Sequence, residues 1–356
     1  MASGSNPEQR TIPVFVGHIF SCAFFRLLFA PHKSENRRIL VIHRQVKSVS
    51  DLSFGMVNTL FFVRYKMLEQ LFILLFFPLI STVKVVIQGI CAKSKIKTQA
   101  QASLINSIIF LITGALMLVF FCRTLPSAKT VIYALAFGIF TVGFQLMYIA
   151  ALRTGSVGLT MIVNNLAVIP PTIMGAILYG EIPSFIQIIG IVLLFAALLF
   201  ISDHGTSSAG VSKIWFISAL LCMLSNSGTK CVQILFSKSP VFGESTAFVA
   251  LSYFIAAALS LILYFIFKKK DEPKIEWDLK LTAGLVLISI ILGVYNYLWV
   301  IALTKMPSFI LIVANSCLCL VFAWISDRIV FKKKATKNQI ISVVLAIISA
   351  ILTNIK

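Results

Sequence analysis

Residues 148–202 have the sequence YIAALRTGSVGLTMIVNNLAVIPPTIMGAILYGEIPSFIQIIGIVLLFAALLFIS. They contain two apolar runs, at about 159–179 and 185–202, and each is long enough to cross the ~30 Å hydrocarbon core of a bilayer as a helix. Only GEIPS separates the runs, so Glu181 and Pro183 are expected at an aqueous turn. The stretch therefore predicts a hairpin of two antiparallel transmembrane helices.

The same pattern returns near the C-terminus, which indicates an internal repeat. Ala302-Leu303 lies 151 residues after Ala151-Leu152. Further matching pairs are Gln145 and Asn296, Tyr148 and Trp299, Asn164-Asn165 and Asn315-Ser316, and, after one inserted residue, Gln187 and Gln339. The chain therefore divides into two related halves.

Two motifs of the first half resemble the EamA-type branch of the drug/metabolite transporter superfamily. They are A-L-x3-S-V-G at 151–158 and, after an apolar helix with Asn and Pro, Y-G-E-x-P-S-x-x-Q-x-x-G at 179–190. The second half departs from this pattern, since Lys333 stands where Glu181 does in the first. The resemblance implies an integral, multi-pass transporter of the plasma or inner membrane, and it points to no single substrate.

The composition excludes a water-soluble globule, because 59% of the residues are hydrophobic and the mean hydropathy is +0.97. The net charge of +19 does not predict a nucleic-acid partner, since most Lys and Arg residues of the ten-run region lie in short gaps between apolar runs. We expect the lipid bilayer and a small-molecule substrate as partners, and a homodimer stays open. The cysteines lack metal-like C-x-x-C spacing, and we expect no metal and no cofactor.

The pattern predicts an all-α membrane protein of ten transmembrane helices, arranged as two inverted five-helix repeats. The apolar runs lie at about 68–91, 104–121, 131–150, 157–179, 185–202, 214–236, 246–267, 281–303, 308–331 and 338–355. Helices satisfy every backbone group internally, and an odd number of spans per half reverses the second half. We expect repeats at 67–202 and 214–356, a linker at 203–213, and an N-terminal extension at 1–66, with Met67 as an alternative start.

Two lysines lie inside apolar runs at equivalent positions, Lys84 in the first run and Lys230 in the sixth. Each lies about 12–14 Å along its helix from the nearest interfacial lysine, Lys93 or Lys238, which is long for snorkelling. The pair predicts two positive charges for an anionic or zwitterionic substrate in a cavity between the repeats. The alternative is that each lysine snorkels along a groove or pairs with a carbonyl, and never touches substrate.

A second set of side chains recurs in both halves and completes the predicted substrate-binding site. Its members are Gln145, Tyr148, Asn164, Asn165, Asn296, Trp299 and Asn315. The i,i+3 spacing places Gln145 with Tyr148, and Asn296 with Trp299, on one helix face each. Amides in a membrane either join helices or bind substrate, and Tyr148 and Trp299 also suit interfacial anchors.

These observations predict a transporter that moves a small polar or anionic metabolite by alternating access through a central cavity. The carboxylates Glu69, Glu181 and Asp327 lie near the ends of runs, so an organic cation would lack a deep counter-ion. The alternatives are a broad-specificity amino-acid or drug exporter and, more remotely, a membrane-embedded enzyme on lipid-linked substrates. We predict no catalytic residue, because no catalytic cluster is visible. Pro170-Pro171 should kink the fourth span.

The two indicators of orientation disagree. Lys and Arg concentrate in loops after odd-numbered runs, which by the positive-inside rule places both ends of the ten-helix core outside. Members of the resembled family usually have cytoplasmic ends. Charge and resemblance therefore predict opposite orientations.

Overall fold

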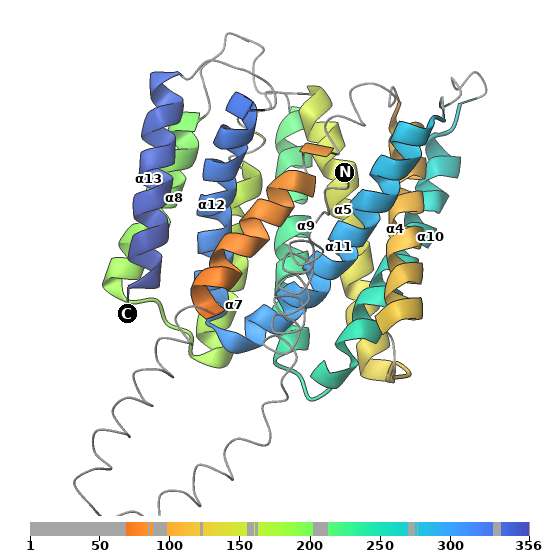
Figure 1. The fold of residues 1–356 in the computed structure, drawn as a ribbon, viewed down its shortest axis with the longest axis horizontal. Helices are drawn as coiled ribbons and strands as arrows, with labels where there is room; N and C mark the ends of the chain where they lie inside the picture. The colour runs from red at the N-terminus through yellow and green to blue at the C-terminus, as the bar shows by residue number, and fades with distance from the viewer. Residues whose placement is uncertain are drawn as a thin grey trace, which may run out of the picture. The chain divides into compact units, whose positions relative to one another are not determined.

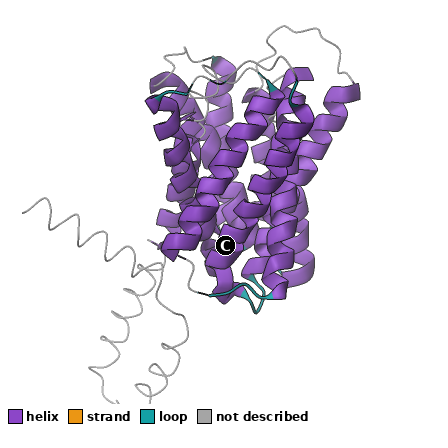
Figure 2. Ribbon diagram, turned by 90° about the vertical axis from the view of Figure 1, so that its right-hand side faces the viewer, coloured by secondary structure: helices purple, strands orange, loops and turns teal. Residues whose placement is uncertain are grey.

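The structure is a computed structural model, and the part of the chain that it describes is helical (Figure 1). The described residues are 69–84, 86–87, 98–121, 124–154, 160, 163–201, 213–269, 275, 277–329 and 336–355. No strand occurs among them (Figure 2). The predicted N-terminal extension, 1–66, lies outside the described residues.

All but the first and fourth of the predicted apolar runs coincide with a described helix to within about five residues at each end, and those two runs are described only in part. The first half contains a helix at 69–84, α4 (Gln99–Phe121), α5 (Ala128–Thr154), the short 3-10 helix η2 (Leu166–Val168), α7 (Ile169–Tyr179) and α8 (Phe185–Ile201). The second half contains α9 (Lys213–Ser237), η3 (Phe242–Glu244), α10 (Ser245–Phe267), α11 (Leu279–Lys305), α12 (Ser308–Ile329) and α13 (Lys337–Asn354). Seven of the described helices are long and apolar enough to cross a membrane, and two shorter apolar stretches accompany them, Val163–Tyr179 and Phe185–Phe200.

Local chemistry sets the turn between α7 and α8. Gly180 ends α7 with φ 66°, a left-handed conformation that glycine adopts without strain. A capping box then starts α8: the Ser184 N–H donates to Gln187 Oε1 (2.8 Å), and the Gln187 N–H donates to Ser184 Oγ (3.4 Å). Thr336 and Gln339 form the same box at α13. The matched glutamines of the repeat therefore begin the last helix of each half.

The proline pair divides the helix that was expected over 157–179. Pro170 and Pro171 have no backbone N–H to continue an α-helical ladder, so the 3-10 turn η2 precedes them and α7 begins at Ile169. The hydroxyl of Thr172 donates to the Val168 carbonyl at 2.8 Å across this junction. The expected kink is thus a 3-10 turn followed by a new helix.

Helices of the two halves pack in pairs that the repeat relates to one another. Corresponding helices meet directly, α4 with α10 and α8 with α13. In addition α5 packs on α9, and the helix at 69–84 contacts α11 through Phe77, whose ring lies 5.4 Å from Tyr295 and 5.2 Å from Trp299. The repeat therefore relates these contacts to one another: α4–α10 and α8–α13 join equivalent helices, and the contact of α5 with α9 corresponds to that of α11 with the helix at 69–84.

Hydroxyl groups and small residues allow the corresponding helices to approach closely. Ser107 Oγ donates to the Ala257 carbonyl (2.9 Å) between α4 and α10, and Ser349 Oγ donates to the Gly190 carbonyl (2.6 Å) between α13 and α8. A Cβ at Gly190 would lie 2.8 Å from Thr353 Cγ2. Such contacts are typical of membrane helices, where small residues let backbones meet.

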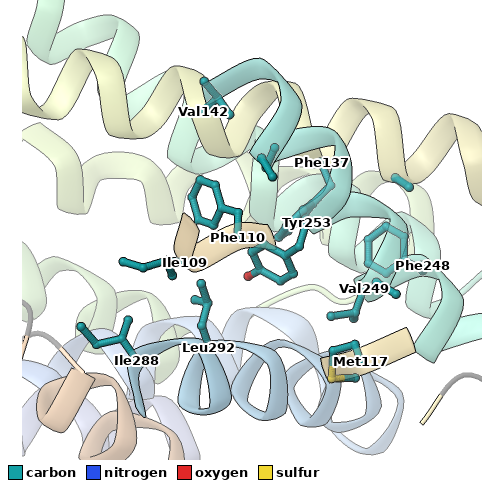
Figure 3. Close-up of a cluster of buried hydrophobic side chains, with 14 of the residues drawn as sticks. Ile109, Phe110, Met117, Phe137, Val142, Phe248, Val249, Tyr253, Ile288 and Leu292 are labelled. Carbon is teal, nitrogen blue, oxygen red and sulfur yellow. The ribbon is translucent and has the colours of Figure 1, made fainter. Parts of the chain in front are cut away.

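The apolar core lies mainly between α4, α5, α10 and α11 (Figure 3). The Tyr253 ring lies 5.6 Å from Phe110 and 6.1 Å from Phe137. Nearby, Phe236 of α9 stacks on Phe248 of α10 with ring centroids 4.1 Å apart. Phe110, Phe137 and Tyr253 also line a cavity, so the core forms one of its walls.

Candidate functional site

A cavity of about 170 Å³ lies between the two halves. Its polar residues from the first half are Lys84, Asn106, Thr141 and Gln145. Those from the second half are Asn226, Thr229, Lys230, Gln233, Asn296 and Asn315. Six of the nine residues predicted as a substrate site therefore line one cavity, namely these two lysines, Gln145, Asn296, Asn315 and Trp299.

Lys84 and Lys230 reach the cavity from equivalent helices of the two halves, and both side chains are partly buried. Among the described residues no carboxylate lines the cavity, and no ion pair engages either ammonium. The cavity is therefore lined by two lysine side chains with no described carboxylate beside them.

An aromatic stack forms one side of the cavity. The Tyr295 and Trp299 rings lie 5.6 Å apart at an interplanar angle of 18°, and Phe77 meets both edge-on. Trp299 is only 3% exposed, so it lies inside the bundle and not at a lipid interface. Flat aromatic faces of this kind provide apolar contact area for a bound molecule.

The predicted amides have different roles in the wall. Both ends of the Asn296 amide are hydrogen-bonded: its Oδ1 accepts from Gln233 Nε2 (3.0 Å) and its Nδ2 donates to the Leu292 carbonyl (2.9 Å). This bond joins α9 to α11. In contrast, Asn315 Oδ1 is buried with no hydrogen-bond partner among the described residues.

Three predicted residues lie outside the cavity lining. The Tyr148 ring stacks on Phe144, with centroids 5.6 Å apart. Asn164 Oδ1 accepts a hydrogen bond from Asn226 Nδ2 (2.9 Å). Because Asn226 lines the cavity and Asn164 does not, Asn164 holds a lining residue in place without bordering the cavity itself. Asn165 precedes η2 and is also absent from the lining.

The sequence interpretation identified Lys230 on α9 but missed the polar residues that share its helix face. Asn226, Thr229, Lys230 and Gln233 follow one another at i, i+3, i+4 and i+7, which places all four on one helix face toward the cavity. Polar residues at this spacing inside an apolar helix could have been found from the sequence. Thr141 gave no such signal, because a single threonine in a membrane helix commonly bonds its own backbone.

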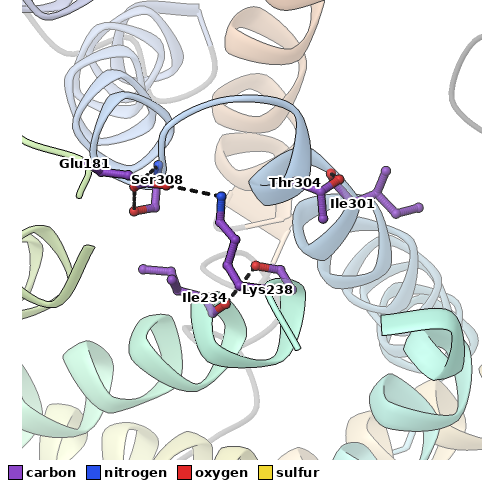
Figure 4. Close-up of polar contacts among 7 residues, drawn as sticks. Glu181, Ile234, Lys238, Ile301, Thr304 and Ser308 are labelled. Carbon is purple, nitrogen blue, oxygen red and sulfur yellow. Dashed lines mark hydrogen bonds and ion pairs between the residues drawn. The ribbon is translucent and has the colours of Figure 1, made fainter. Parts of the chain in front are cut away.

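At one end of the bundle, the lower end in Figure 1, charged side chains join the two halves. Figure 4 shows Glu181, from the α7–α8 turn, facing both Ser308 and Lys238. Its carboxylate accepts from the Ser308 N–H (2.7 Å) and hydroxyl at the start of α12, and pairs with Lys238 Nζ (3.1 Å) after α9. Glu69 pairs with Lys305 in the same way. We call these two groups the latch.

The comparisons with known proteins agree with this architecture. The EamA-like transporter family matches residues 71–203 and again 213–355. A solved structure described only as "Crystal structure of protein" shares 16% identity and a TM-score of 0.62, over 79% of this chain and 97% of its own, which is a likeness of fold alone. No curated protein matches. With one family match in each half, the chain belongs to the EamA-like transporter family and is a multi-pass membrane protein.

Proposed function

We propose that the chain moves a small polar or anionic metabolite across the membrane by alternating access through the cavity. Ten transmembrane helices would form two inverted repeats, at 67–202 and 214–356, with the linker at 203–213 between them. The paired contacts between the halves support this arrangement, because an in-plane pseudo-twofold axis gives every such contact a counterpart.

The observation that carries the proposal is the pair of lysines in one cavity. An ammonium group within a membrane is unfavourable unless it meets water or a partner, and Lys84 and Lys230 have no described carboxylate beside them. A substrate carboxylate or phosphate would supply the missing negative charge. The aromatic stack of Tyr295 and Trp299 would hold the rest of the molecule.

The latch supports the alternating-access step. It ties the halves together through side chains that are 11–27% exposed. Ion pairs that water can reach separate at modest cost. Glu181 and Glu69 come from the first half, and their partners come from the second. In the proposed cycle the latch is closed in one state and opens when the halves rock apart at that end.

A thermal-shift screen of the purified protein in detergent tests the proposal. Amino acids, carboxylates, sugar phosphates and cationic drugs are compared on wild type, on Lys84→Met/Lys230→Met, and on Lys213→Met. Lys213 is an exposed lysine at the start of α9 and serves as the matched control. A ligand at about 100 times its Kd should add about 2.7 kcal/mol. We expect anions to stabilise wild type and the control, and not the double variant.

Two results would overturn the proposal. If the double variant responds like wild type, Lys84 and Lys230 have a structural role. If only cations stabilise the protein, the broad-specificity exporter is the better description. Uptake into proteoliposomes of the anion found in the screen then measures transport itself, and uptake that ignores both lysines would count against the proposed site.

A further inference from the structure

Two polar atoms of the cavity wall have no hydrogen-bond partner among the described residues, Thr141 Oγ1 on α5 and Asn315 Oδ1 on α12. Both atoms are buried. Native structures pair nearly all such groups, because a buried polar atom without a partner is destabilising. The wall therefore offers two hydrogen-bonding groups to a molecule in the cavity.

Thr141 differs in this respect from other threonines of the bundle. Thr113 Oγ1 and Thr172 Oγ1 each donate to the carbonyl four residues earlier, at 2.8 Å. This is the usual arrangement for a threonine inside a membrane helix. No such bond forms at Thr141, so its hydroxyl can rotate toward a ligand.

The Asn315 side chain is held in place by its neighbours. Its amide contacts the Tyr295 hydroxyl, and Tyr295 in turn stacks on Trp299. The residue also lines the cavity. A substrate hydroxyl suits both Thr141 and Asn315, because a hydroxyl group donates and accepts hydrogen bonds.

The volume of the cavity limits the size of the molecule. A cavity of about 150 Å³ is known to take benzene, and this one measures about 170 Å³. A short chain or a single ring fits this space, whereas a nucleotide sugar is much larger. One small molecule of this size would meet both the lysine pair and the two unpaired polar atoms.

Building on the proposed function, we infer that Thr141 and Asn315 form a hydroxyl subsite and that the substrate is a small hydroxylated carboxylate. Its carboxylate faces Lys84 and Lys230, and one of its hydroxyl groups binds the hydroxyl subsite. Thr141 belongs to the first half and Asn315 to the second. A substrate bound at the hydroxyl subsite would therefore contact both halves, as it would at the lysine pair.

Matched carboxylates that differ by hydroxyl groups test the inference: glycolate against acetate, lactate against propionate, and gluconate against hexanoate. In the tightest-binding pair, the hydroxylated acid should bind wild type at least about tenfold more tightly. The Thr141→Val variant keeps the shape and removes the hydroxyl, so this preference should fall to about threefold or less. Thr172→Val, whose hydroxyl bonds its own helix, should keep the full preference.

The readout separates a ligand contact from structural damage, since Thr141→Val should leave the affinity for the deoxy acid unchanged. If wild type binds both members of each pair equally, and binding still requires Lys84 and Lys230, the hydroxyl subsite is refuted and the proposed function stands. If no carboxylate binds in a lysine-dependent way, both are refuted. Should Thr141→Val fail to fold, Asn315→Leu provides the same comparison.

Discussion

Neutralising Glu181 should open the latched end of the bundle. In the Glu181→Gln variant the side chain keeps its size and can still accept a hydrogen bond, but it loses the charge that attracts Lys238 and the N-terminus of α12. These contacts exist only while the two halves are together. The substitution should therefore destabilise the closed state relative to a state that is open at this end.

The size of the effect follows from the contacts. Glu181 caps α12 from the other half through the Ser308 N–H, and replacing this charge-assisted hydrogen bond by a neutral one costs about 1 kcal/mol. The ion pair with Lys238 joins side chains that are 11% and 27% exposed. Its contribution to the stability of the closed state therefore lies toward the upper end of the roughly 0.2–1 kcal/mol found for accessible pairs. Together they give about 1.5–2 kcal/mol, which shifts the closed-to-open equilibrium roughly 10- to 30-fold.

Thiol labelling measures this shift. A chain without its 7 native cysteines carries Thr229→Cys as a reporter, because Thr229 lines the cavity. A maleimide that does not cross membranes is added to one side of proteoliposomes at a time. The Glu181→Gln variant should label about tenfold faster or more from the latched side. Lys129→Gln removes an exposed lysine at the start of α5 and should not change the rate.

Two outcomes would refute this reasoning. Equal labelling rates in Glu181→Gln and Lys129→Gln would show that the latch does not control access. A second reporter, Ala256→Cys, lies in the apolar core, where Ala256 is 0% exposed. If that position also labels faster in Glu181→Gln, the variant loosens the whole bundle, and a specific gate is excluded.

Three further results are expected. Gly190→Ala should lower the free energy of unfolding by about 1–3 kcal/mol, because its Cβ would lie 2.8 Å from Thr353 Cγ2, whereas Gly243→Ala meets nothing within 4 Å and should be neutral by thermal melting. Asn226→Leu should cost about 1 kcal/mol by leaving Asn164 Oδ1 without its 2.9 Å bond, and adding Asn164→Leu should recover part of that loss. The positive-inside rule places the lysine-rich loops inside and the latched end, where α13 ends, outside. Alkaline phosphatase fused to the C-terminus should therefore be active, and an inactive fusion would show that the opposite orientation is correct.

The helices were predictable because their signals are local. An apolar run of about twenty residues has few alternatives to a transmembrane helix. The matched Gln187 and Gln339 also have a local cause, since each closes a capping box with a hydroxyl residue three positions earlier, Ser184 or Thr336. The 3-10 turn before Pro170 was less predictable, because proline removes hydrogen bonds without specifying how the chain replaces them.

The sequence predicted which helix faces line the cavity, but not how far along each helix the cavity extends. Along α5, Phe137, Thr141 and Gln145 are spaced by four residues and all line the cavity. Tyr148 continues the same face, as its spacing from Gln145 predicts, yet it does not line the cavity and stacks instead on Phe144, which does. Helical periodicity fixes which face a residue occupies. How far along that face the cavity extends depends on the facing helices, which local spacing does not encode.

Two kinds of contact between the halves bear on how the protein would move. Between α8 and α13, and between α4 and α10, side-chain hydroxyls of one half reach backbone carbonyls of the other, as Ser349 does with Gly190 and Ser107 with Ala257. These buried contacts allow little sliding, because the helices touch through their backbones. At the latch, in contrast, flexible Lys and Glu side chains make the connection near water, where separation is cheap. Motion is therefore expected to pivot on the buried helix pairs and to open at Glu181 and Glu69.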